Sequence, residues 1–170
     1  MSKKFYILVF VLFIAGAVGC TVNYSMGGAS IEPDVKTISI DNIPNRAPSG
    51  PSGMGQMFTN ELKDKFQSQT SLKFVDSRGD LEFSGEITGY STKPQAVGGQ
   101  DERATKTRLT VTTHIKFTNN KYPDKSYETD FSQYEDFDAS QNLSDVEDQL
   151  VEDITEKLVQ DIFNKAVVNW

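Results

Sequence analysis

The chain has 170 residues, with 17 Lys and Arg against 24 Asp and Glu, and a formal net charge of −7. This length is sufficient for one domain with a hydrophobic core. The acidic balance argues against binding to nucleic acid and against electrostatic docking on anionic lipid. We therefore predict no nucleic-acid partner.

The first 20 residues have the pattern of an export signal. Lys3 and Lys4 precede an apolar run over 5–15, and small residues then lead to Cys20, the only cysteine. A charged start, an apolar stretch of about ten residues and a small-residue cleavage site are typical of a secretory signal. The run is too short for a membrane-spanning helix, which needs about 20 apolar residues.

The residues around the cysteine suggest lipidation. Ala17-Val18-Gly19-Cys20 resembles a lipobox, in which the cysteine thiol is acylated and the chain is cut just before it. We predict a signal peptide over 1–19, lipidation at Cys20 and a tether over 20–34; a secreted protein and an uncleaved anchor are the alternatives. Removal of the two lysines takes the net charge from −7 to −9, so the acyl chains must provide the membrane anchor.

Residues 35–170 have the pattern of a single α+β domain. A first strand is predicted over 35–41, followed by a loop rich in Pro and Gly. Apolar residues at four-residue spacing then predict an amphipathic helix from near Ser52 to about Ser68. Residues 72–75 are interpreted as a short strand or a lead-in to the next one.

Alternating patterns predict three longer strands, over 81–92, 103–118 and 127–137. In the first of these, Gly85 and Gly89 are expected on the buried face and Tyr90 on the exposed face. Glycines on the buried face leave room for a bulky neighbour.

A last helix is predicted from about Leu143 to Trp170. Ser144 and Glu147 have the spacing of a capping box, in which each side chain satisfies a free backbone N–H at the helix start. The predicted fold is a two-layer α+β sandwich, with two helices on one face of a mainly antiparallel four-stranded sheet, in the order β-α-β-β-β-α. The other sheet face is then polar, and exposed to water or to a partner.

The predicted strand over 103–118 carries a basic row. Its members are Lys106, Arg108, His114 and Lys116. Alternate residues of a strand project to one side, so the row concentrates positive charge that can grip phosphates. We take Lys106, Arg108 and Lys116 as candidate phosphate contacts.

The alternative is that the row pairs with carboxylates on the returning strand. A hairpin turn near Tyr122 places three opposite charges across from each other: Lys116 and Glu128, His114 and Asp130, Arg108 and Asp136. Such cross-strand pairs stabilise a sheet by a few tenths of a kcal/mol to about 1 kcal/mol. The two interpretations remain open, and both hold if the charges are shared.

Patterns for catalysis and metal binding are weak. His114 is the only histidine, and no G-x-S-x-G frame accompanies it. A zinc site needs more His and Cys ligands than one. Glu135, Asp136 and Asp138 lack the glycine and terminal glutamate of a calcium loop. We predict no enzymatic activity, no cofactor and no metal.

Further motifs follow the lipobox in a definite order. They are Gly28-Ala29-Ser30, Thr37-Ile38-Ser39-Ile40, Phe58-Thr59-x-x-Leu62, the Gly79–Tyr90 run, Arg108-Leu109-Thr110-Val111 and Asp161-Ile162-Phe163-Asn164. With Cys20 they resemble the lipopolysaccharide (LPS)-assembly lipoprotein (LptE-like) family of Gram-negative outer membranes. The resemblance covers nearly the whole mature chain.

The resemblance implies a non-enzymatic, outer-membrane partner of the LPS-transport β-barrel LptD. Such a protein sits as a plug in the barrel lumen, helps the barrel to fold and contacts LPS. A polar sheet face is compatible with this role, because polar side chains line a barrel lumen. The net charge gives no support for strong binding of anionic LPS, so any grip must be local. The alternative is a stand-alone lipid- or glycan-binding lipoprotein.

Overall fold

The computed structural model describes residues 31–95 and 105–167. The predicted signal peptide, Cys20, most of the tether and Trp170 lie outside these residues. The elements in chain order are β1 (Thr37–Ile40), α2 (Met54–Gln69), β2 (Lys73–Phe74), β3 (Leu81–Gln95), β4 (Lys106–Asn119), the 3-10 turn η1 (Pro123–Lys125), β5 (Tyr127–Asp138) and α3 (Leu143–Val167). In the described ranges, no helix combines the length and apolar character needed to cross a membrane.

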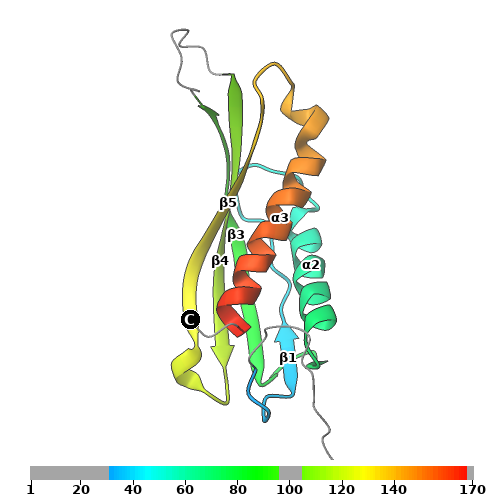
Figure 1. Cartoon of the computed structure of the whole chain (residues 1–170), viewed down its shortest axis with the longest axis vertical. Coiled ribbons are helices and arrows are strands. Elements are labelled where there is room, and N and C mark those ends of the chain that lie inside the picture. The colour runs from blue at the N-terminus through cyan, green and yellow to red at the C-terminus, as the bar shows by residue number, and fades with distance from the viewer. Residues whose placement is uncertain (1–30, 96–104, 168–170) are drawn as a thin grey trace, which may run out of the picture.

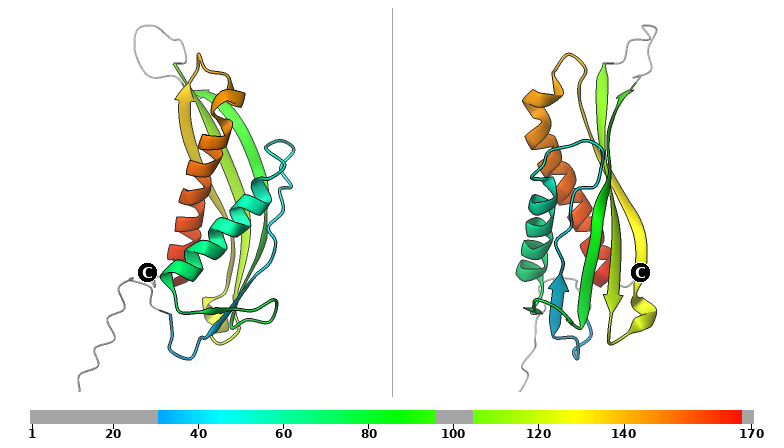
Figure 2. Two further views of the ribbon diagram at one scale, coloured as in Figure 1. Left: turned by 90° about the vertical axis from the view of Figure 1, so that its right-hand side faces the viewer. Right: turned by 180° about the vertical axis from the view of Figure 1, so that it is seen from behind.

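Both helices cover one face of a single sheet, as Figures 1 and 2 show. The two-layer α+β architecture is therefore confirmed. The sheet has five strands, in the order β2-β1-β3-β4-β5, where four were predicted. It is also mixed, because β1 pairs in parallel with both β2 and β3, while β3, β4 and β5 are antiparallel. The parallel pair arises because α2 crosses over from β1 and returns the chain beside it.

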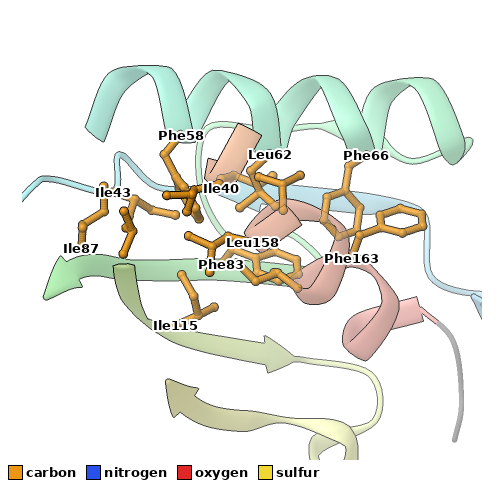
Figure 3. Packing of buried hydrophobic residues seen from close by; sticks show 14 of the residues in the cluster. Ile40, Ile43, Phe58, Leu62, Phe66, Phe83, Ile87, Ile115, Leu158 and Phe163 are labelled. Carbon is orange, nitrogen blue, oxygen red and sulfur yellow. The ribbon is translucent and has the colours of Figure 1, made fainter. Parts of the chain in front are cut away.

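The core lies between the helices and the sheet. Phe58, Leu62 and Phe66 recur every four residues on α2, and all three are fully buried against β3 (Figure 3). Four-residue spacing puts side chains on one stripe of a helix, which explains why this stripe is the buried one. On the sheet side, the ring of Phe83 lies 5.0 Å from that of Phe66 and 4.8 Å from that of Phe117, centroid to centroid.

A β-bulge in β3 reverses the faces of the strand. The register against β4 shifts between Ile87 and Gly89, so that Gly89 is opposite Thr112 and Tyr90 is opposite Val111. Tyr90 is only 9% exposed. The predicted faces of Gly89 and Tyr90 are therefore wrong. The physical reason is that a bulge adds one residue, and each residue added to a strand exchanges its two sides.

The start of α3 also differs from the prediction. The helix begins at Leu143, so Ser144 lies within its first turn, and its hydroxyl is 3.4 Å from Asp145 Oδ1. Glu147 instead accepts a hydrogen bond from the hydroxyl of Tyr90. The predicted capping box is therefore wrong. The hydroxyl of a largely buried tyrosine needs an acceptor, and the bulge brings Tyr90 to this carboxylate. Burial, followed by the Glu147 carboxylate, raises the pKa of Tyr90.

Candidate functional site

The basic row lies on the sheet face opposite the helices. Leu109, Val111 and Ile115 of β4 are buried, so the residues between them project to the other side. We call this side the open face. It comprises Glu82, Ser84, Glu86, Ser91 and Lys93 of β3, Lys106, Arg108, Thr110, Thr112, His114, Lys116 and Thr118 of β4, and Glu128, Asp130, Ser132, Tyr134 and Asp136 of β5.

The predicted register between the basic row and the returning strand is confirmed. The three pairs are Arg108 and Asp136, His114 and Asp130, and Lys116 and Glu128. A slip by one residue would turn every β5 side chain to the opposite face. Opposite charges on one face and apolar residues on the other therefore favour the same register.

Arg108 is held by two neighbours. Its Nε and Nη2 donate hydrogen bonds to the two carboxylate oxygens of Asp136, at 2.7 and 2.8 Å. The centre of the guanidinium lies 3.6 Å from the ring centroid of Tyr134. The Asp136 hydrogen bond raises the pKa of Arg108, and the guanidinium lowers the pKa of Asp136. One edge of the guanidinium is thus occupied, and only the remaining donors are available to a ligand.

The imidazole of His114 lies between two carboxylates. Its Nδ1 is 2.7 Å from Oδ1 of Asp130, and its Nε2 is 3.0 Å from Oε1 of Glu128. Both ring nitrogens donate only in the protonated form. These hydrogen bonds, first that to Asp130 and then that to Glu128, raise the pKa of His114. In the described ranges, no three His, Cys, Asp or Glu side chains form a group that can hold a metal ion.

His114→Gln is expected to remove a pH-dependent part of the stability. The folded-state pKa of His114 lies above the unfolded value of about 6.5. Its stabilising contribution is therefore complete below about pH 6.5 and is lost as the pH rises through the folded value. Thermal unfolding of both proteins between about pH 5 and 9 measures the effect. The stability of the wild type falls more steeply with pH than that of the variant; parallel profiles would contradict this prediction.

The basic row is divided between the two ends of the open face. Lys106 and Lys116 are ten positions apart on β4, which is about 33 Å at 3.3 Å per residue. Neither ammonium is in an ion pair within the described part of the chain. Lys106 and Arg108 therefore form one group, near the end of β3, and Lys116 belongs to the other end.

Lys116 lines a depression of about 310 Å³ at its end of the open face. The other walls come from β1, β3 and the turn before β3, and they include Ser39, Asp41, Arg78 and Glu82. The sequence patterns did not indicate this combination, because the parallel pairing of β1 with β3 brings these segments together. Only the turn Ser77-Arg78-Gly79-Asp80 could be recognised from its residues. In the structure, Arg78 of this turn has a φ of 57°.

The chain enters the domain at the same end, which is the lower end in Figure 1. The hydroxyl of Tyr122, just after β4, donates to Asp34 at 2.9 Å. Lys125 of η1 forms an ion pair with Glu32. These contacts hold the entering segment against the connection between β4 and β5.

Comparison with known proteins identifies the family of the chain. The family model described as LptE, lipopolysaccharide-assembly, matches residues 35–166. No curated protein matches the chain. The fold is similar to that of a minor lipoprotein from Acinetobacter baumannii, at 11% identity over 77% of this chain and 91% of that one, with a TM-score of 0.52.

Two further solved structures have the same fold. One is rare lipoprotein B from Shewanella oneidensis, at 13% identity, 76% and 92% coverage and a TM-score of 0.50. The other is a hypothetical protein from Chlamydia trachomatis, at 8% identity, 79% and 99% coverage and a TM-score of 0.54. Since the family model spans most of the sequence, this chain belongs to the LptE lipopolysaccharide-assembly family.

Proposed function

We propose that the protein is an outer-membrane lipoprotein that acts as plug and assembly partner of an LptD-like β-barrel, and so aids LPS delivery to the outer leaflet. Family membership supports this role. The observation that carries the proposal furthest is the open face, where hydroxyl and charged side chains from three strands cover one side of the sheet. Polar side chains also line a barrel lumen, so the two surfaces are chemically compatible.

Anchorage is part of the same proposal. It comprises a signal peptide over 1–19, lipidation at Cys20, a tether over 20–34 and one domain over 35–170. A fully extended segment of the ten residues after Cys20 reaches at most about 36 Å, so the domain stays near the membrane surface. Attachment by more than one acyl chain is stable. The role is structural and not enzymatic.

Contact with LPS phosphates is assigned, within the proposal, to Lys106 and Arg108 as one group and to Lys116 as another. The Lys106→Glu, Arg108→Glu double variant is expected to weaken LPS binding about tenfold, because a charge-assisted contact is worth about 1.5–3 kcal/mol. Lys73→Glu, on the exposed edge strand β2, is the control. Unchanged LPS binding by the double variant would remove these residues from the proposal. If the double variant unfolds without a specific loss of LPS binding, Lys106 and Arg108 serve only in cross-strand pairing.

Co-purification tests the barrel partnership. The native full chain, extracted from outer membranes in a mild detergent, is expected to elute together with a large β-barrel protein. If it elutes alone, the plug role is wrong, and the stand-alone lipid- or glycan-binding role replaces it.

Cys20→Ala is expected to leave the protein in the soluble periplasmic fraction. Because the barrel itself could hold the variant in the membrane, the fractionation is done in cells without the barrel, where persistent membrane attachment would contradict lipidation.

A further inference from the structure

The depression lined by Lys116 differs from the rest of the open face in its charges. The ion pairs of the open face, such as that of Arg108 with Asp136, all lie outside the depression. The depression is lined by Arg78, Lys116, Asp41 and Glu82. Within the described residues, none of these four groups forms an ion pair of 4.0 Å or less. Two cations and two anions are therefore free to face a ligand.

The strand pairing places three of these charges, those of Glu82, Lys116 and Asp41, in two neighbouring rows. Ser39 lies opposite Glu82 in the first row. Ser84 lies opposite Lys116 in the second row. Asp41, the residue just after β1, donates its N–H to the carbonyl of Phe83 at 2.9 Å and so lies next to that row. Residues on the same face of a strand are two positions apart, so the rows are separated by about 6.6 Å. Both signs of charge thus lie within the span of one small molecule.

Ser39 adds a hydroxyl group to this site. The residue is only 4% exposed, yet it lines the depression. Its hydroxyl oxygen still reaches solvent, because the fully buried side-chain oxygens without a partner in the described residues are those of Thr113 and Tyr127. The turn that carries Arg78 packs against the backbone of Ser39, because a Cβ on Gly79 would lie 2.6 Å from the Ser39 nitrogen. The hydroxyl is therefore a further hydrogen-bonding group available in the depression.

We infer that the depression binds a small zwitterion that carries a phosphate and a primary ammonium group, such as phosphoethanolamine. Arg78 and Lys116 match the phosphate, with the surrounding serine and threonine hydroxyls as further donors. Asp41 and Glu82 accept hydrogen bonds only, which suits the three N–H groups of an ammonium. The same two carboxylates repel a simple anion. The volume of about 310 Å³ is that of a small-ligand site.

The fold favours a membrane surface as the source of these phosphate and ammonium groups. The depression, lined by residues at the start of β3 and the end of β4, lies at the end where the chain enters the domain. A lipid anchor on Cys20 therefore brings lipid headgroups to it. This source rests on the lipidation proposed above, whereas binding of the zwitterion itself does not.

Calorimetric titration of the full chain, in a non-ionic detergent, tests the inference with phosphoethanolamine, inorganic phosphate and ethanolamine as probes. Phosphoethanolamine is expected to bind at least tenfold more tightly than either fragment. Lys116→Gln and Glu82→Gln are each expected to weaken its binding about tenfold, since each removes one charge-assisted contact. Lys93→Gln and Glu86→Gln, on the open face outside the depression, are the matched controls and leave it unchanged.

Each other outcome is decisive. Equal affinity for inorganic phosphate and phosphoethanolamine would show that the site does not select a zwitterion. No binding of phosphoethanolamine at about 10 mM would show that the depression is not a binding site. Equal losses in the control variants overturn the location. Glycerophosphoethanolamine has the diester phosphate of a lipid headgroup; binding as tight as that of the monoester supports the lipid source, and much weaker binding overturns it. Failure of these titrations leaves the barrel partnership intact, because no barrel takes part in them.

Discussion

Phe83→Ala is expected to lower the free energy of unfolding by about 3–5 kcal/mol. Phe83 is 1% exposed on the inner face of β3. Its ring packs between Phe66 of α2 and Phe117 of β4, at centroid distances of 5.0 and 4.8 Å. Removing it opens a cavity where the two layers meet, and a close-packed interior relaxes only partly around such a gap. Urea unfolding of the full chain measures the change as a shift in midpoint at constant slope.

Phe74→Ala is the matched control for this variant. Phe74 lies on the edge strand β2 and is 37% exposed, so its loss is expected to cost less than about 1 kcal/mol. A similarly small cost for Phe83→Ala would mean that α2 does not pack on β3 as the structure shows.

Gly85→Ala is expected to lower the free energy of unfolding by about 2–3 kcal/mol. An added methyl group would lie 2.2 Å from the carbonyl oxygen of His114 and 3.0 Å from Cδ1 of Ile115. The carbonyl belongs to the backbone of β4, which is paired on both sides and cannot move without opening the sheet. Gly85 was expected to leave room for a packed helix or an aromatic ring; the atoms nearest to it are instead the His114 carbonyl and the Ile115 side chain of the paired strand.

Gly53→Ala tests whether the close approach is the cause. Gly53 precedes α2 with φ −81° and ψ −8°, values that alanine adopts readily. An added Cβ there meets nothing within 4 Å. Stability is expected to stay the same or to rise by up to about 1 kcal/mol, because alanine reduces the freedom of the unfolded chain. Comparable losses in the two glycine variants would refute the steric explanation.

The sequence by itself determined the two layers and much of the pairing. The repeat of Phe58, Leu62 and Phe66 defined the buried stripe of the first helix. The register of β4 against β5 could be predicted because one pairing satisfies both the charges and the buried residues, as the pair of Arg108 and Asp136 shows. These features depend on residues that are close in sequence or joined by a short turn, so local periodicity is enough to define them.

The tertiary structure decided the rest. The sequence left 72–75 open between a short strand and a lead-in, because the two residues of β2 are too few for a periodic pattern to decide. The bulge that turns Tyr90 inward has no signal in the alternation of residue types. The depression needed Ser39, Arg78 and Lys116 from three separate segments. Parallel pairing between distant segments is decided by packing in space, and local patterns do not encode it.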